Sequence, residues 1–203
     1  REGQMNAATK ITVARMFMII PAAVFFILAY ETGFFMAFLL VSAAVFGLLC
    51  ATDFIDGYIA RKTNTVSNLG KFLDPLADKV VLTVMLFLIM WKGSAMYDTE
   101  VFPYASLVIA LLSGIIISRE LIIGIFRLLA VQKSVVLAAD KYGKLKTVFL
   151  DFAVALLIIA PLNVVLYWIS QILYYIGAVL AVGSGLNYII KNKSVLSDKK
   201  EEV

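Results

Sequence analysis

Residues 164–190 read VVLYWISQILYYIGAVLAVGSGLNYII, a run of 27 residues without a charged side chain. At ~1.5 Å of rise per residue, a helix over this run is about 40 Å long, which exceeds the ~30 Å hydrocarbon core of a bilayer. A run of this length and composition therefore predicts a helix that crosses a membrane.

The rest of the chain has the same character. Of its 203 residues, 62% are hydrophobic and 16% are charged, and the mean hydropathy is +0.95. A soluble domain of this length cannot bury so large an apolar fraction in one core. We therefore expect an all-α, polytopic membrane protein with six transmembrane helices, over residues 11–30, 35–59, 73–91, 104–130, 144–160 and 164–190.

The basic residues gather on one side of this predicted bundle. The opposite side carries Glu31, Asp98 and Glu100 with a single lysine, Lys92. Since cytoplasmic loops are enriched in lysine and arginine, both termini are predicted to be cytoplasmic. The net charge of +4 is then interpreted as contact with anionic lipid headgroups and a phosphate-bearing substrate, and nucleic acid is not an expected partner. The basic side comprises Lys10, Arg15, Arg61, Lys62, Lys71, Lys133, Lys141, Lys144, Lys146, Lys191, Lys193, Lys199 and Lys200.

The domain organisation is simple. Residues 5–191 are expected to form a single six-helix membrane domain, followed by a charged cytoplasmic tail over 192–203. Residues 1–4 are interpreted as a cloning remnant before Met5. A cleaved secretory signal is not expected, because Arg15 and Pro21 interrupt the first apolar segment.

Two groups of residues in this domain are expected to have structural roles. Aromatic side chains near the ends of the predicted helices are expected to anchor the protein at the bilayer interfaces; they are Trp91, Tyr142, Trp168, Tyr174 and Tyr175. Small residues on the last helix permit close helix packing, within the chain or between two protomers; they are Gly177, Gly183 and Gly185.

The chemistry available to the chain is narrow. It has no histidine, and its single cysteine, Cys50, lies in an apolar run. An internal disulfide and a thiolate metal cluster are therefore excluded. A general base working near neutral pH must be a carboxylate, a lysine or a tyrosine.

Four aspartates stand out at one membrane surface. Asp53 and Asp56 are spaced i, i+3 at the end of the second predicted helix, and Asp74 and Asp78 are spaced i, i+4 at the start of the third. Each pair shares a helix face, and the short connection makes the two helices antiparallel neighbours. Four carboxylates beside a low-dielectric region repel one another and favour bound cations.

Oxygen ligands without histidine or cysteine indicate two Mg²⁺ or Mn²⁺ ions, with Ca²⁺ as a competitor. The alternative is that the aspartates are helix caps and interfacial charges. Their pairing partners would then be Arg61, Lys71 and Lys79.

Written out, the segment is D-x2-D-G-x2-A-R-x8-G-x3-D-x3-D. It resembles the signature of the CDP-alcohol phosphotransferase family at all eight fixed positions. That family comprises six-helix membrane enzymes that transfer a substituted phosphate from a CDP-linked donor to an alcohol and release CMP. The resemblance implies that Asp53, Asp56, Asp74 and Asp78 bind the metals and that Asp78 also serves as the catalytic base. It assigns the nucleotide pocket to Gly57, Ala60, Arg61 and Gly70.

Three further segments, at 9–15, 117–120 and 143–147, resemble the bacterial branch whose donor is CDP-diacylglycerol and whose acceptor is sn-glycerol 3-phosphate. In the first of them Thr9 stands where that branch has Asn. This resemblance implies transfer of a phosphatidyl group in phospholipid biosynthesis. It also implies a homodimer in the bacterial cytoplasmic membrane with the active site facing the cytoplasm.

An anionic acceptor is also favoured by basic residues placed in or beside the helices around the aspartates. Arg119 is the most informative, because an arginine inside an apolar helix is unfavourable unless it faces a polar cavity. For Lys141, Lys144 and Lys146, topology and lipid contact explain the charge equally well. The predicted acceptor-phosphate residues are Thr12, Arg15, Arg119, Arg127, Lys141, Lys144 and Lys146.

Two alternatives stay open on the sequence. A sister enzyme on the same scaffold would use another acceptor, such as inositol phosphate; the basic residues argue against serine. A protein of a different class, a divalent-cation transporter, would also place carboxylates in the membrane. Against a transporter, the acidic set lies at one surface without matching carboxylates farther along the chain.

Overall fold

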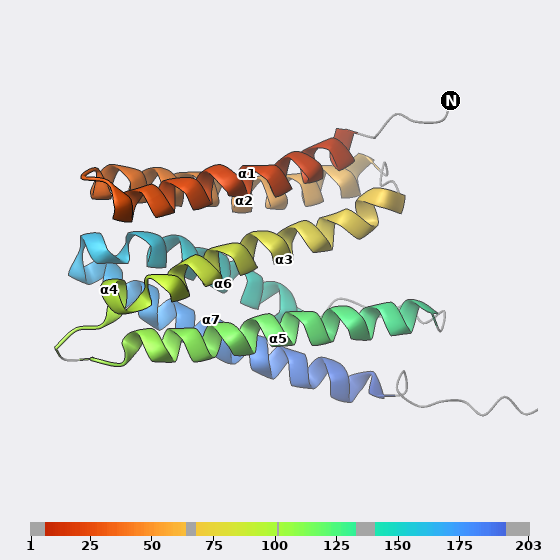
Figure 1. Ribbon diagram of the computed structural model, residues 1–203. Helices are drawn as coiled ribbons and strands as arrows, with labels where there is room; N and C mark the ends of the chain where they lie inside the picture. The colour runs from red at the N-terminus through yellow and green to blue at the C-terminus, as the bar shows by residue number, and fades with distance from the viewer. Residues whose placement is uncertain (1–6, 64–67, 101, 133–140, 194–203) are drawn as a thin grey trace, which may run out of the picture.

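The computed structural model describes the backbone of residues 7–63, 68–100, 102–132 and 141–193. Within these ranges, the side chains of residues 7–11, 53–63, 68–75, 78, 131–132, 141–142 and 144 lie outside the description. The described residues form helices and no strands (Figure 1). In chain order the helices are α1 (Ala7–Glu31), α2 (Phe35–Thr63), α3 (Asn68–Trp91), α4 (Gly93–Tyr97), α5 (Ala105–Gln132), α6 (Lys141–Ile159), the 3₁₀ turn η1 (Ala160–Leu162) and α7 (Val164–Lys191).

Five of the described helices are long and apolar enough to cross a membrane. Their spans are Thr12–Glu31, Phe35–Thr52, Ala105–Ala130, Leu145–Leu162 and Val164–Lys191. In α3, where the side chains of residues 68–75 and 78 lie outside the description, the apolar part of the described residues is Lys79–Trp91. The protein is therefore an all-helical, membrane-embedded chain.

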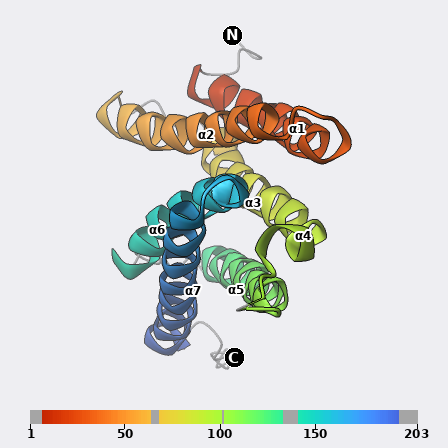
Figure 2. The ribbon, with the colours of Figure 1, turned by 90° about the vertical axis from the view of Figure 1, so that its left-hand side faces the viewer.

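The long helices run side by side, and α3 lies in the middle of them (Figures 1 and 2). Among described residues, α3 packs on α1, α5 and α6, whereas α2 packs on α1 and α6. Helices α2 and α3 run antiparallel (Figure 1). The prediction that they are neighbours concerns the ends on either side of residues 64–67, where the side chains lie outside the description, so it stays a prediction.

One end of the bundle gathers the starts of α1, α3 and α6 and the last turns of α2, α5 and α7 (Figure 1). We call it the basic end, since helix termini that carry basic residues predicted to be cytoplasmic, such as Lys10, Lys71 and Lys191, lie there. The opposite end holds the connection from α1 to α2, the short helix α4 and η1.

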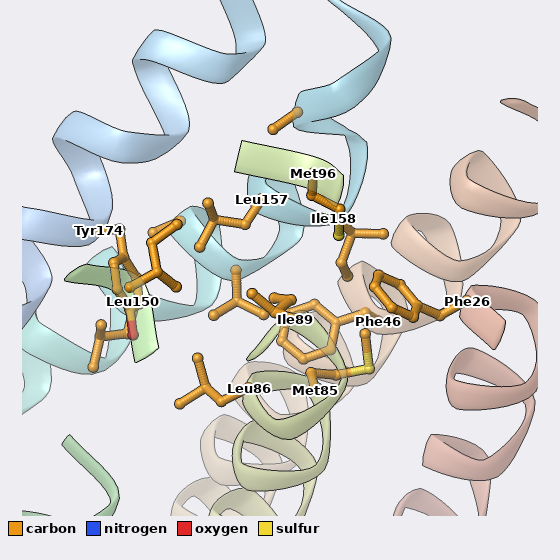
Figure 3. Packing of buried hydrophobic residues seen from close by; sticks show 14 of the residues in the cluster. Phe26, Phe46, Met85, Leu86, Ile89, Met96, Leu150, Leu157, Ile158 and Tyr174 are labelled. Carbon is orange, nitrogen blue, oxygen red and sulfur yellow. The ribbon is translucent and has the colours of Figure 1, made fainter. Parts of the chain in front are cut away.

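Large apolar side chains from four helices fill the core, as Figure 3 shows. Phe26 of α1, Phe46 of α2, Met85 and Ile89 of α3 and Ile158 of α6 are all fully buried. Within a bilayer these side chains exchange lipid for protein contacts, so close van der Waals packing is what holds the helices together here. This core fixes α3 against both α1 and α6.

Hydrogen bonds from side-chain hydroxyls to backbone carbonyls also join the helices and fix the position of each one along its neighbour. The buried Ser42 hydroxyl of α2 donates to the Ala22 carbonyl of α1 over 2.8 Å. At the opposite end, the Tyr97 hydroxyl of α4 donates to the Leu157 carbonyl over 2.9 Å, and Tyr167 of α7 donates to the Tyr97 carbonyl over 2.8 Å. These two bonds stabilise α4, which forms within residues 92–103, between two of the predicted membrane helices.

The aromatic residues fall into two groups. Trp91, Trp168 and Tyr175 are 55%, 44% and 36% exposed, as interfacial anchors would be. Tyr174 is fully buried, and its hydroxyl lies 2.6 Å from the Ser113 hydroxyl, with which it shares a hydrogen bond. The prediction that Tyr174 is an interfacial anchor is therefore wrong; it joins α5 to α7.

Two of the small residues of α7 serve packing within the chain. A Cβ at Gly177 would lie 2.8 Å from Leu150 Cδ2 of α6, and a Cβ at Gly185 would lie 2.9 Å from Arg119 Nε of α5. A Cβ at Gly183 would meet no atom within 4 Å apart from the backbone of its own helix. Contact between protomers through Gly177 and Gly185 is therefore not supported, and only Gly183 keeps an open face.

We predict that Gly177→Ala lowers the thermal stability of the detergent-solubilised protein. The added methyl group overlaps the buried Leu150 side chain, and overpacking of this kind is typically unfavourable by about 1–3 kcal/mol. Gly183→Ala is the matched control, with a neutral or slightly stabilising effect expected from the better helix propensity of alanine. Equal melting temperatures for the two variants would contradict the α6–α7 contact described here.

Candidate active site

The four aspartates occupy continuous helix at the basic end. Asp53 and Asp56 lie in the last three turns of α2, and Asp74 and Asp78 lie in the first three turns of α3. The unbroken helices keep the i, i+3 and i, i+4 spacings that place each pair on one face. The four carboxylates themselves lie outside the described side chains, so their convergence on metal ions stays a prediction.

The same limit applies to the predicted nucleotide pocket. Gly57, Ala60 and Arg61 lie on α2 and Gly70 lies on α3, so their backbone shares the basic end with the aspartates, but their side-chain surroundings lie outside the description. Among the side chains that the structure describes, no group of three or more acidic or cysteine residues comes together to hold a metal. The donor set of the aspartates, carboxylate oxygen alone, suits Mg²⁺ or Mn²⁺.

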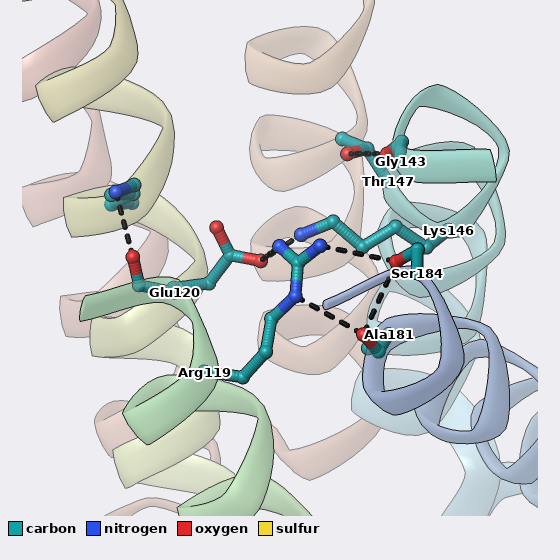
Figure 4. A network of polar contacts seen from close by, with 8 residues as sticks. Arg119, Glu120, Gly143, Lys146, Thr147, Ala181 and Ser184 are labelled. Atoms are coloured by element: carbon teal, nitrogen blue, oxygen red, sulfur yellow. Dashed lines mark hydrogen bonds and ion pairs between the residues drawn. The ribbon is translucent and has the colours of Figure 1, made fainter. Parts of the chain in front are cut away.

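A buried ionic network lies between α5, α6 and α7 (Figure 4). Its centre is the Glu120 carboxylate, since Arg119 Nη1 lies 2.8 Å from Glu120 Oε1 and the Lys146 ammonium contacts the same oxygen. The side chains of Arg119, Glu120 and Lys146 are 13%, 16% and 8% exposed. Buried charges of this kind persist only when they are paired and hydrogen-bonded.

Arg119 also bridges α5 to α7. Its Nε donates to the Ala181 carbonyl over 3.1 Å, and its Nη2 donates to the Ser184 hydroxyl over 3.0 Å. The side chain passes over Gly185, where any Cβ would meet it. Two edges of the guanidinium are thus fixed by α7, and Nη1 remains directed at Glu120.

Lys79 of α3 joins the network from the other side. Its ammonium donates to the Glu120 backbone carbonyl over 2.8 Å, and it fills the space where a Cβ on Gly124 would lie. Lys79 directly follows Asp78, the predicted catalytic base, in the sequence. Its bond to Glu120 therefore joins the network to α3 at the residue next to that base.

The other predicted acceptor residues differ in their surroundings. Arg127 is exposed, and its guanidinium lies 5.4 Å from the centre of the Tyr188 ring, a cation–π arrangement. Thr12 and Arg15 are buried on α1, 4% and 3% exposed. The side chains of Lys141 and Lys144 lie outside the description, and both residues occupy the first turn of α6.

Positive charge prevails around the network. Arg127 acts electrostatically on both Lys79 and Arg119, and Lys146 experiences repulsion from Lys79 and Arg119 and attraction to Asp151. Among the described side chains of the network, four cations, Lys79, Arg119, Arg127 and Lys146, thus outnumber the two carboxylates of Glu120 and Asp151. A site of this kind, water-poor and cationic, binds phosphate groups through arginine forks and lysine point charges.

Sequence reasoning identified Arg119 and Lys146 but missed Lys79, Glu120 and Ser184 as partners in the same network. Glu120 carried a signal, because it follows Arg119 inside an apolar helix. Lys79 carried a weaker signal in its position after Asp78. Ser184 carried none, since a serine in a membrane helix commonly bonds its own backbone, as it also does here to the Ala181 carbonyl.

Comparison with known proteins agrees with this architecture. A family model described as CDP-alcohol phosphatidyltransferase matches residues 5–182. A Bacillus subtilis (strain 168) protein named CDP-diacylglycerol–glycerol-3-phosphate 3-phosphatidyltransferase is 34% identical over 94% of this chain and 97% of its own length. Proteins of the same name from Salmonella paratyphi A and Mycoplasma genitalium are 32% and 30% identical, over 97% and 91% of this chain and 100% and 82% of their own lengths. With one family model spanning most of its length and full-length relatives at this identity, the chain belongs to the CDP-alcohol phosphatidyltransferase family.

Proposed function

We propose that this protein transfers the phosphatidyl group of CDP-diacylglycerol to sn-glycerol 3-phosphate, forming phosphatidylglycerophosphate and CMP. The observation that carries this proposal is the buried Arg119–Glu120–Lys146 network, which gathers cations at mid-length of α5 and is joined to α3 by Lys79, the residue after Asp78. Family membership supports phosphatidyl transfer, and the names of the relatives support this donor and acceptor. A phosphorylated acceptor needs such a site, whereas a neutral acceptor does not.

In the proposed reaction, one of the two free hydroxyls of glycerol 3-phosphate attacks the phosphorus that carries the diacylglycerol. The new P–O bond forms as the bond from that phosphorus to the oxygen bridging it to CMP breaks, so CMP leaves with the bridging oxygen. Asp78 accepts the hydroxyl proton as the new bond forms. Metal ions held by Asp53, Asp56, Asp74 and Asp78, two Mg²⁺ or Mn²⁺, would supply charge neutralisation at the pyrophosphate.

The remaining substrate contacts follow from the family signature and from charge. Gly57, Ala60, Arg61 and Gly70 are proposed to shape the cytidine nucleotide pocket. Arg119 and Lys146 are proposed to bind the acceptor phosphate. Thr12, Arg15, Arg127, Lys141 and Lys144 are proposed to line the approach to that phosphate.

We also propose six membrane crossings, with α3 as the sixth. A helix of 24 residues spans about 36 Å, long enough for a bilayer core, and α3 runs beside the other long helices over their length (Figure 1). Lysines and arginines at the basic end would then place both termini and the active site in the cytoplasm, with the protein in the bacterial cytoplasmic membrane.

Homodimer formation remains a separate proposal. It rests on the dimers that are common in the family. Among the glycines of α7, Gly183 is the one with open space where a second helix could approach. The alternatives of inositol phosphate as acceptor and of divalent-cation transport gain no support from the relatives, which carry one transferase name.

The proposed function predicts CMP release by the lipid-reconstituted protein with CDP-diacylglycerol, Mg²⁺ and glycerol 3-phosphate. Release should be abolished by a chelator, because the pyrophosphate charge is then not neutralised. Serine, inositol phosphate and a reaction without acceptor serve as controls. Release with inositol phosphate alone would assign the protein to a sister activity, and no release with any acceptor would contradict the proposal.

Asp78→Asn is expected to lower kcat by at least about a hundredfold while leaving the protein folded and inserted, since a general base contributes roughly 10²–10⁴-fold. Glu100→Gln is the matched control, an exposed acid at the opposite end of the bundle that should retain parental turnover. The measurement is the steady-state rate of CMP release in vesicles. Near-parental kcat in Asp78→Asn would exclude Asp78 as the base.

A further inference from the structure

The proposed site for the acceptor phosphate contains a carboxylate, that of Glu120, at the position where the phosphate would bind. Glu120 Oε1 lies 2.8 Å from Arg119 Nη1 and contacts the Lys146 ammonium, so its carboxylate occupies the position between these two cations (Figure 4). A phosphate oxygen bound by the same two groups would need that position. Glu120 and the acceptor phosphate therefore compete.

We infer that the Glu120 carboxylate holds the place of the acceptor phosphate in the free enzyme and is displaced from Arg119 and Lys146 when that phosphate binds. This inference rests on the proposed function, which supplies the phosphorylated acceptor. It makes Glu120 a positioning and specificity residue, since it acts through the two cations that it holds.

The geometry allows displacement without rebuilding the site. Arg119 keeps Nε on the Ala181 carbonyl and Nη2 on the Ser184 hydroxyl, and both partners belong to α7. Only Nη1 depends on the Glu120 carboxylate. The guanidinium would therefore stay in place while the Glu120 side chain rotates, and Nη1 would pass from carboxylate to phosphate.

Lys79 is independent of that rotation. Its ammonium bonds the backbone carbonyl of Glu120, which does not move when the side chain changes rotamer. The contact between α3 and α5 thus survives displacement, and the aspartate-bearing end of α3 keeps its position relative to the network. Lys146, by contrast, loses its carboxylate partner and is released to bind the phosphate.

The charges around the network match this exchange. Among the described side chains, Lys79, Arg119, Arg127 and Lys146 outnumber the carboxylates of Glu120 and Asp151. A phosphate monoester carries about −1.5 to −2 at neutral pH. A bound acceptor therefore adds negative charge where these cations are in excess, which offsets the contact that Glu120 loses.

The test is the affinity of Glu120→Gln for the acceptor. The amide keeps the size of the side chain and an oxygen that accepts from Arg119 and Lys146, but it competes weakly with phosphate because it has no charge. We expect the Kd of glycerol 3-phosphate, measured by calorimetry without donor, and the Ki of inorganic phosphate to fall about tenfold. The KM for CDP-diacylglycerol should stay within about twofold of the parent.

Glu120→Asp is the second variant, which keeps the charge but withdraws it by one methylene, so the affinity for glycerol 3-phosphate should again rise. Glu31→Gln at the opposite end is the control and should leave both constants unchanged. An unchanged or weaker affinity in both Glu120 variants would overturn the inference and make Glu120 a fixed part of the site. The parent is assayed first, since absence of CMP release with glycerol 3-phosphate would contradict the proposed function itself.

Discussion

The pairing of Glu120 with Arg119 and Lys146 is the interaction on which the rest of the site depends. Without this carboxylate, two cations would lie unpaired between membrane helices, where an isolated charge is strongly unfavourable. With it, the middle of α5 is joined to the second turn of α6. Because Arg119 also bonds α7 and Lys79 bonds the Glu120 carbonyl, four helices meet at one short segment.

The contacts between helices differ in kind along the bundle. At the opposite end, Tyr97 and Tyr167 join α4, α6 and α7 through their hydroxyl groups, and farther along α7 the buried Tyr174 joins it to Ser113 of α5. Apolar side chains fill the space around them. Toward the basic end, the charged groups around Glu120 make the contacts between helices instead.

The sequence predicted the long helices well, because each corresponds to an apolar run that a bilayer demands. Their polar extensions were underestimated: α1 begins at Ala7, α2 continues to Thr63, and α3 begins at Asn68. Helix α4 was missed because Gly93 and Ser94 suggest a loop, and the bond from Tyr97 to α6 that stabilises it joins residues 60 apart. Likewise Asn163, predicted as a break, accepts from the Val165 amide and caps α7.

For the site, the sequence identified the residues whose chemistry is unusual for their surroundings. An arginine in an apolar helix and four aspartates at a membrane surface are unusual, and the order of charged and apolar residues along the sequence shows both. The pairing of Glu120 with Lys146 could not be predicted, since it requires α5 and α6 both to pack on α7. The Cβ contacts that make Gly177 and Gly185 serve packing within the chain depend on that packing too.

The measurement that tests the central claim most directly is the preference for glycerol 3-phosphate over glycerol, taken as the ratio of kcat/KM values, in the parent and in Lys146→Gln. Lys193→Gln, an exposed lysine just beyond α7, controls for the general loss of positive charge at the basic end. If Lys146 binds the acceptor phosphate, its variant should lose at least about tenfold of the preference, because the phosphate then lacks one of its two cations. An unchanged preference in Lys146→Gln would contradict the assignment of the buried network as the acceptor site.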